Sequence, residues 1–143
     1  MDNAVPLKDL ASPKAMEFLQ SHSTCVISTV NDIGKVFGAA MHYAVFEDKL
    51  FLITKQGTTK ARNIREHPQV AITVYDDLQT IQMQGVADIE TDKDIMERVH
   101  TELTKRRKYG SGVQLPPITE LNEGHYLAIG ITPFTLNYSD YER

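Results

Sequence analysis

The chain alternates apolar and polar residues in short runs, and polar or glycine-containing turns separate these runs. Two-residue alternation is typical of a strand with one buried face, and enrichment in Val, Ile and Thr supports that assignment. The connections between successive runs are tight, which favours antiparallel pairing of neighbours. The sequence predicts strands over residues 24–30, 36–46, 50–54, 70–75, 81–89, 125–131 and 133–141.

Two segments between these strands have helical spacing and recognisable ends. Ser12-Pro13 combines an N-cap residue with a proline at the first helical position, which predicts a helix over residues 13–21. A second helix is expected over residues 59–66. It must stop before Pro68, because the residue that precedes a proline is disfavoured in the α conformation.

A third helix is expected to begin at Thr91 or Asp92, since either residue is a good N-cap. Ile95, Val99 and Leu103 follow at four-residue intervals. That spacing places the three side chains on one face, which we expect the helix to bury.

Short strands, tight connections and a few small helices indicate a mainly β fold with small helices, in one domain that covers residues 1–143. The sheet should be antiparallel, and six or more strands favour closure into a barrel, because closure removes the exposed edges. Gly85 lies inside a predicted strand and indicates a bulge or a close backbone approach. Residues 110–124 contain Pro116-Pro117 and are expected to form a loop.

Composition narrows the function classes. Fifteen Lys and Arg against nineteen Asp and Glu leave a formal net charge of -4, which argues against broad electrostatic binding to nucleic acid or anionic lipid. No apolar stretch is long enough to cross a bilayer, and the first residues lack the pattern of a secretion signal. We therefore expect a soluble, cytoplasmic protein with no nucleic-acid partner and no membrane partner.

One segment has the features of a phosphate-binding site. The apolar run 50–54 ends before Gly57, and Thr58, Thr59 and Lys60 then open the helix expected over residues 59–66. The free N–H groups of a first helical turn attract anions, and two hydroxyls and an ammonium group add further donors. Alternatively, a threonine simply caps a surface helix and Lys60 is solvated. The spacing does not match a nucleotide-triphosphatase loop, so the phosphate would belong to another ligand.

Other candidate chemistries are weaker. Cys25 and His42 could form a nucleophilic pair, but a buried and inert Cys25 is favoured because its neighbours are apolar. The histidines lack the short-spaced cysteine or carboxylate partners of zinc and iron sites, so no metal centre is expected. The five histidines are His22, His42, His67, His100 and His125.

Two features bear on nucleic-acid binding. The basic run 105–108 falls where the third helix should end, and favourable interaction with the helix dipole accounts for it without a partner. Phe37, Tyr43 and Phe46 could stack on bases, but alternating aromatic residues on a strand more often pack a core. The acidic balance of the chain also argues against a nucleic acid.

The central part of the chain resembles a known family. The segments Gly57-Thr58-Thr59-Lys60-Ala61-Arg62-Asn63-Ile64 and His67-Pro68-Gln69-Val70-Ala71-Ile72 are similar to the split-barrel flavoproteins related to pyridoxamine 5′-phosphate oxidase, and the likeness covers most of residues 24–90. The resemblance implies an antiparallel six-stranded split β-barrel. It also implies FMN in a groove at a homodimer interface, with its phosphate held by Thr58, Thr59 and Lys60.

The resemblance implies further contacts less directly. Ile53 and Thr54 fall where the family's strand end touches the ribityl chain and the ring. A glutamine near the flavin in the oxidase is replaced here by Thr80, while two glutamines follow on the same face by alternation. The remaining implied contacts are the strand residues whose backbone faces the ring, Ala39, Ala40, Met41 and His42, and the two glutamines, Gln82 and Gln84.

Two departures separate the chain from the oxidase itself. The oxidase has arginines where this chain has Gly38 and Thr59, and its C-terminal substrate motif does not occur in residues 137–143. We therefore expect a flavin-dependent oxidoreductase that acts on a small molecule and is not a true pyridoxamine 5′-phosphate oxidase. A deazaflavin-binding protein, a haem-binding protein and a non-enzymatic flavin-binding stress-response protein are the alternatives.

Overall fold

The computed structural model describes residues 5–107 and 125–141, so the predicted loop over residues 110–124 lies outside the described residues. Within them, no helix has both the length and the hydropathy that crossing a bilayer requires. The helices are Leu7–Leu10 (α1), Pro13–Ser21 (α2), Thr59–Glu66 (α3) and Lys93–Arg107 (α4). The strands are Thr24–Val30 (β1), Val36–His42 (β2), Ala44–Phe46 (β3), Lys49–Lys55 (β4), Gln69–Tyr75 (β5), Gln79–Ile89 (β6) and Tyr126–Asp140 (β7).

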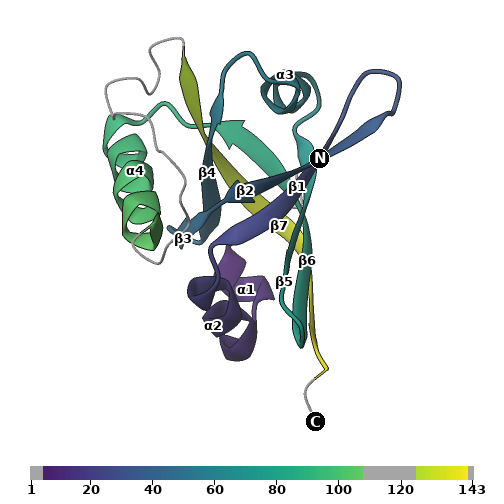
Figure 1. Cartoon of the computed structure of the whole chain (residues 1–143), viewed down its shortest axis with the longest axis vertical. Coiled ribbons are helices and arrows are strands. Elements are labelled where there is room, and N and C mark those ends of the chain that lie inside the picture. The colour runs from purple at the N-terminus through teal and green to yellow at the C-terminus, as the bar shows by residue number, and fades with distance from the viewer. Residues whose placement is uncertain (1–4, 108–124, 142–143) are drawn as a thin grey trace.

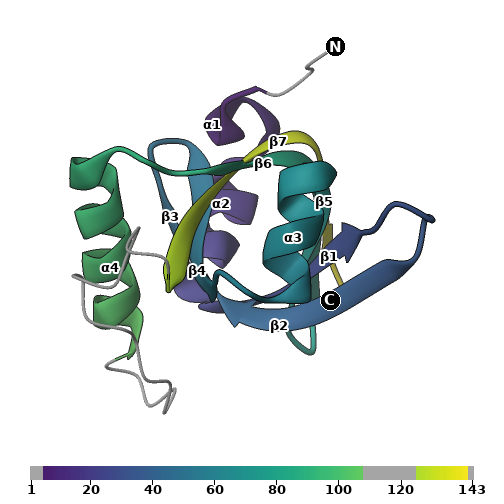
Figure 2. The same ribbon diagram turned by 90° about the horizontal axis from the view of Figure 1, so that it is seen from above.

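The strands form one antiparallel sheet of seven strands in the order β2-β1-β5-β6-β7-β4-β3. β2 and β3 lie at opposite edges of this sheet, although only Tyr43 separates them in the sequence. The sheet therefore has to curl until its edges approach each other, which produces the half-barrel seen in Figures 1 and 2. The predicted mainly β, antiparallel class is confirmed, with seven strands in place of the six expected.

Two predicted strand boundaries were wrong. Residues 36–46 were predicted as one strand, but this run divides at Tyr43. The Tyr43 side chain is fully buried and its hydroxyl donates a hydrogen bond to the carbonyl of Leu19 at 2.7 Å, and the chain passes there from one sheet edge to the other. Conversely, residues 125–131 and 133–141 were predicted as two strands and form the single strand β7.

β7 continues through Pro133 because the β6–β7 ladder shifts its register between Gln84 and Gly85. Proline has no N–H group to donate, and a bulge is one of the few places where a sheet tolerates that loss. A Cβ atom at Gly85 would lie 2.7 Å from the carbonyl oxygen of Thr132 and 3.1 Å from the Cα of Pro133. The bulge and the close backbone approach predicted at Gly85 are therefore both confirmed.

The three predicted helices are present, and side chains cap them as expected. Ser12 Oγ accepts a hydrogen bond from the N–H of Ala15 at 3.1 Å at the start of α2. Asp92 Oδ1 accepts one from the N–H of Ile95 at 3.1 Å, so Asp92 rather than Thr91 caps α4. The short helix α1 was not predicted, because a single turn has no periodicity to detect.

Apolar side chains cover both faces of β4. Leu52 faces the main core inside the half-barrel, while Phe51 faces α4 and packs against Val99 and Leu103. The predicted buried stripe of α4 is thus confirmed at Val99 and Leu103, with Ile95 at its partly exposed margin. The main core also contains large, fully buried side chains from several strands, including Ile27, Ile72, Ile81 and Ile129.

The helices close the half-barrel at its ends and one side. α1 and α2 lie at one end, α3 lies at the other end, and α4 packs beside β3 and β4 (Figure 1). α3 buries Ala61 and Ile64 in the main core. α3 and α4 lie on opposite sides of β4 in Figure 2. This arrangement leaves the first turn of α3 at the rim of the half-barrel.

Candidate functional site

The candidate site begins where β4 ends and α3 starts. Thr58 is the N-cap residue of α3, and its Oγ1 accepts a hydrogen bond from the N–H of Ala61 at 3.3 Å. The same hydroxyl donates to the carbonyl of Lys55 at 2.9 Å. The capping interpretation of Thr58 is therefore correct. Because the carbonyl of Lys55 already takes the hydroxyl proton, this hydroxyl is not a spare donor for a ligand in the arrangement seen here.

A hollow of about 440 Å³ separates this turn from β2. β2 is an edge strand, so part of its backbone N–H and C=O groups have no partner within the sheet. A polar backbone edge therefore faces the helix start across a space of the size typical of small-molecule sites. The residues that line the hollow are Phe37, Gly38 and Ala39 on one wall and Gly57, Thr58, Thr59 and Lys60 on the other.

The charge in this hollow is positive. Lys60 is half-buried, and within the described part of the chain its ammonium group forms no ion pair. Thr59 and Lys60 are the first two residues of α3, where backbone N–H groups have no acceptor within the helix. The positive end of the helix dipole adds to the charge of Lys60. Together these groups form a donor set suited to a phosphate.

The strand residues implied by the family resemblance divide between the two faces of β2. Ala39 and Met41 face inward and pack against the main core. Ala40 pairs with Val26 and lies on the outer face, and His42 lies on that face as well. Only Ala39 of these four lines the hollow beside Lys60. The other three residues could contribute there only through the backbone of β2.

The two glutamines lie on the outer face of the sheet, away from Lys60. Gln82 is aligned with Ala40 through Thr73 and Val26, in one row across β6, β5, β1 and β2. Gln84 lies in the neighbouring row. Neither glutamine lines the hollow beside Lys60. Both side chains are nevertheless exposed on the same surface as the outward-facing side of β2.

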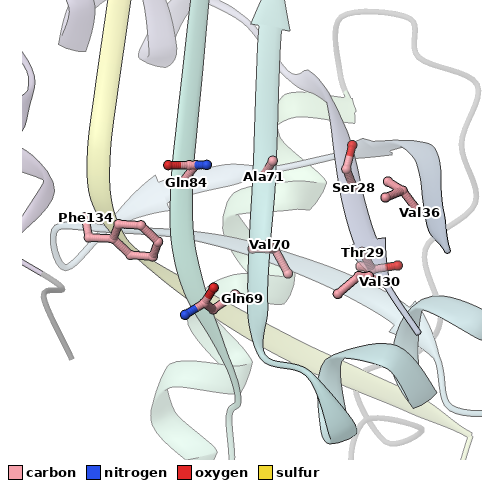
Figure 3. Close-up of a pocket in the computed structure, with 9 residues that line it drawn as sticks. All are labelled: Ser28, Thr29, Val30, Val36, Gln69, Val70, Ala71, Gln84 and Phe134. Atoms are coloured by element: carbon pink, nitrogen blue, oxygen red, sulfur yellow. The ribbon is translucent and has the colours of Figure 1, made fainter. Parts of the chain in front are cut away.

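Gln84 lines a second, shallower hollow of about 240 Å³ on this outer face. Figure 3 shows that it extends from Val36 on β2 to Phe134 on β7. The N–H of Gln84 donates a hydrogen bond to Thr135 Oγ1 at 3.2 Å, across the ladder that contains the bulge. Small side chains such as Ser28 and Ala71 form the floor of this second hollow and keep the surface open.

Ile53 and Thr54 point in opposite directions from the end of β4. Thr54 is buried, and its Oγ1 lies 3.4 Å from Thr58 Oγ1, directly behind the helix start. Ile53 lies on the other face of β4 and packs against Met96 and Ala128. The structure therefore places Thr54 beside the candidate site, and it directs the Ile53 side chain toward α4.

Phe37, Gly38 and Gly57 line the hollow beside Lys60 but were not among the predicted site residues. Phe37 and Gly38 could have been identified from the pairing of β1 with β2, because this pairing determines which part of β2 faces the start of α3. A Cβ atom at Gly38 would lie 3.8 Å from Val26 Cγ1, an ordinary contact. Gly38 therefore leaves room for a larger side chain, and Lys60 is the cationic residue of the hollow.

Cys25 is buried in this fold and lies on the opposite face of the sheet from His42. Its side chain is 2 % exposed, and burial raises the pKa of the thiol to about 12. The β1–β2 register places Cys25 opposite Met41 and places His42 opposite Thr24, on the other face of the sheet. The buried position favoured for Cys25 is confirmed.

Two of the described histidines contact carboxylates: His22 Nε2 lies 3.0 Å from Asp76 Oδ2, and His67 belongs to a cluster with Asp32 and Glu66. His67 Nε2 lies 2.6 Å from Asp32 Oδ1, and Glu66 is close enough for one ligand atom of each residue to lie within 4.8 Å of the others. The hydrogen bond from His67 holds the pKa of Asp32 below its usual range. The two carboxylates are exposed, and exposed acidic groups of this kind are common without a metal ion. The contact links the β1–β2 turn to the C-terminal end of α3.

Two of the three aromatic candidates for base stacking are core residues. Tyr43 is fully buried, and Phe46 is 7 % exposed and stacks on Phe51 with a ring separation of 4.3 Å. Phe37 lies at the hollow, and the ammonium group of Lys35 is 5.5 Å from its ring centre. The core interpretation is therefore correct for Tyr43 and Phe46.

The family assignment follows from comparison with known proteins. A family profile described as pyridoxamine 5′-phosphate oxidase matches residues 11–126. No curated protein matches the chain. The matching solved structures share its fold. A conserved hypothetical protein from Mycobacterium tuberculosis, Rv2991, is 23% identical, with a TM-score of 0.75 over 98% of this chain and 88% of that one.

Two further structures are similar over comparable lengths. General Stress Protein 26 from Bacillus anthracis is 25% identical, with a TM-score of 0.70 over 89% of this chain and 92% of that one. A structure described as an F420 reductase is 21% identical, with a TM-score of 0.71 over 89% of this chain and 98% of that one. The profile match covers most of the sequence, and the chain therefore belongs to the pyridoxamine 5′-phosphate oxidase family.

Proposed function

We propose that this protein binds FMN and acts as a flavin-dependent oxidoreductase on a small molecule. The observation that carries the proposal is the hollow between α3 and β2. There the Lys60 ammonium group and the first N–H groups of α3 lie opposite the open edge of a strand. Membership of a family in which flavin is a common ligand supports the same conclusion.

The residues present fit a phosphate group. In this proposal Lys60 neutralises phosphate charge, and the hydroxyl of Thr59 and the backbone N–H groups of Thr59 and Lys60 donate hydrogen bonds to it. Thr58 supports the site indirectly by capping the helix whose N-terminus binds the anion. When bound, FMN supplies the electron transfer, and the chain provides binding, orientation and exclusion of water.

The same site argues against the specific activity of the family's oxidase. Gly38 and Thr59 stand where the oxidase has arginines, so Lys60 is the cationic residue among those that line the hollow. The final strand, β7, also lacks the oxidase's substrate motif. We therefore expect no useful turnover of pyridoxamine 5′-phosphate. A rate on the order of 1 s⁻¹ or more would contradict this expectation.

We further propose that the functional form is a homodimer. The outer face of the sheet carries Ala40, Gln82 and Gln84 beside a shallow hollow, and a second copy is needed to enclose a ligand on so open a surface. A stable interface should bury more than roughly 1,000 Å². Sedimentation equilibrium of the purified protein should give twice the mass of the chain, and a flavin-loaded monomer would contradict the proposal.

The decisive experiment is identification of the ligand that copurifies with the protein. We expect an oxidised-flavin spectrum and a released compound with the mass of FMN. A deazaflavin spectrum would show that the site binds a deazaflavin in place of FMN, as the name of the F420 reductase suggests for that protein. A Soret band would show that it binds haem. If the protein is isolated empty, FMN at a hundredfold excess over its Kd should stabilise it by about 2.7 kcal/mol, seen as a higher Tm.

Enzymatic and non-enzymatic flavin binding can be separated in the same preparation. An oxidoreductase should reoxidise or reduce its flavin repeatedly when supplied with a suitable donor and acceptor. If the protein binds flavin stoichiometrically but shows no turnover with any donor or acceptor, the alternative of a flavin-binding stress-response protein is favoured.

A further inference from the structure

Buried polar side chains in this protein gather behind the hollow beside Lys60. Apart from Tyr43 and Cys25, the buried polar side chains of the described residues are Thr29, Thr54 and Asn63. Thr54 lies against the N-cap hydroxyl of Thr58, and Asn63 belongs to α3 itself. Asn63 also contacts the third residue, Thr29, so these three side chains take part in two hydrogen bonds, and both involve the segment that forms one wall of the hollow.

Asn63 joins that wall to the sheet. Its Nδ2 donates a hydrogen bond to Thr29 Oγ1 at 3.1 Å, and both residues are 2 % exposed. Asn63 follows Lys60 by three residues, so it lies one helical turn from the start of α3. Thr29 on β1 is the direct pairing partner of Phe37 on β2, which lines the opposite wall. One hydrogen bond thus connects the two walls through β1.

This hydrogen bond constrains α3 in a way that its apolar contacts do not. Ala61 and Ile64 hold the helix against the core, but hydrophobic contact is non-directional and tolerates small slides and rotations. A buried amide-to-hydroxyl bond has a required length and direction, and loss of one partner leaves the other unsatisfied. The other side-chain link from this region to the β1–β2 turn, between His67 and Asp32, is exposed and therefore a weak constraint.

We propose that Asn63 is a positioning residue for the phosphate site. Through Thr29, it holds Lys60 and the first N–H groups of α3 at the correct distance from the edge of β2. This inference rests on the proposed function, because it assigns to Asn63 the geometry of the same phosphate-binding hollow. It adds a residue that touches neither the hollow nor the ligand.

The test removes both polar groups together, so that no unsatisfied partner is left behind. We expect the double variant Asn63→Leu/Thr29→Val to remain folded and to bind FMN at least tenfold more weakly than wild type. Thr29→Ser retains the accepting hydroxyl and should keep the FMN Kd within about twofold. Ile81→Val, a core substitution on β6 far from the hollow, is the control for a general loss of stability.

A second readout separates positioning from a purely structural role. If Asn63 places Lys60, then Lys60→Ala should weaken FMN binding strongly in wild type and only slightly in the double variant. Equal effects of Lys60→Ala in both backgrounds, or an unchanged FMN Kd in the double variant, would overturn the inference.

The third readout needs no ligand. The amide resonances of Thr59 and Lys60 should shift in the double variant and stay in place in Thr29→Ser. If wild type binds no FMN, the proposed function fails, and these resonances alone then decide whether Asn63 positions the start of α3. Unchanged resonances in the double variant would overturn the inference in that case too.

Discussion

The hydroxyl of Thr58 accepts a hydrogen bond from the N–H of Ala61 at 3.3 Å while it donates one to the carbonyl of Lys55 at 2.9 Å. This arrangement joins the end of β4 to the start of α3 through a single side chain. The two adjacent threonines therefore have different roles. Thr58 caps the start of the helix, and Thr59 is exposed beside Lys60.

Thr58→Ala should therefore affect stability. Loss of an N-cap hydroxyl lowers the free energy of unfolding by about 1 kcal/mol, because an N–H group of the first turn loses its partner. Thr58→Ser retains the oxygen and is the matched control. Urea unfolding of both variants would test this prediction, and equal midpoints for Thr58→Ala and wild type would show that the cap contributes nothing.

Lys60→Ala should affect ligand binding far more than stability. A charge-assisted hydrogen bond to phosphate contributes about 1.5–3 kcal/mol, whereas a half-buried lysine with no ion pair contributes little to folding. Lys55→Ala removes an exposed lysine from the same connection and is the control. Thr59→Ala should act in the same direction as Lys60→Ala with a smaller effect, since it removes a neutral donor.

The measurement is titration with FMN followed by flavin fluorescence, together with a thermal melt of each variant. If Lys60→Ala and Lys55→Ala bind FMN with the same affinity, the phosphate does not bind in this hollow.

Gly85→Ala should destabilise the fold. The added Cβ atom would lie 2.7 Å from the carbonyl oxygen of Thr132, and a backbone atom held in a sheet cannot move away as a flexible side chain would. Overpacking of this kind costs about 1–3 kcal/mol. Gly38→Ala places a Cβ at ordinary contact distance in another strand, so its free energy of unfolding should change much less. Chemical denaturation of the two variants side by side would check the difference.

Cys25 should be protected from thiol reagents in the folded protein. Burial raises the pKa of its thiol from 9.0 to about 12, so near pH 8 the folded state keeps it protonated. As the pH rises from about 9 toward 12, the unfolded chain releases this proton before the folded chain does, and the free energy of unfolding falls. Cys25→Val should reduce this alkaline loss of stability in urea unfolding at pH 8 and pH 10. Rapid labelling of native protein near pH 8 would contradict the assignment.

Local patterns were sufficient to predict much of the secondary structure. Ser12 before Pro13 marked the start of α2 because a hydroxyl cap and a fixed φ act within one turn. The turn that separates the strands predicted over residues 24–30 and 36–46 has a similar local cause. There Asn31 Oδ1 accepts hydrogen bonds from the N–H groups of Ile33 and Lys35, and Gly34 adopts a φ of 82°.

Long-range packing accounts for the predictions that failed. The division of residues 36–46 at Tyr43 depends on a hydrogen bond to Leu19, which is 24 residues away in the sequence. The continuity of β7 through Pro133 depends on the bulge opposite Gly85. Neither interaction leaves a local signal, because apolar alternation looks the same on both sides of the break and proline usually ends a strand.

The candidate site divides in the same way. Thr58, Thr59 and Lys60 could be identified from the sequence alone, because a strand end, a cap and a helix start are contiguous, and the donors of a first helical turn follow from local geometry. The facing wall could not. Phe37 and Gly38 reach this hollow only because β2 is an edge of a curled sheet, and Asn63 reaches Thr29 only because α3 closes the end of the half-barrel. Pairing and closure join residues that are far apart in the chain, so only the tertiary structure decided what faces Lys60.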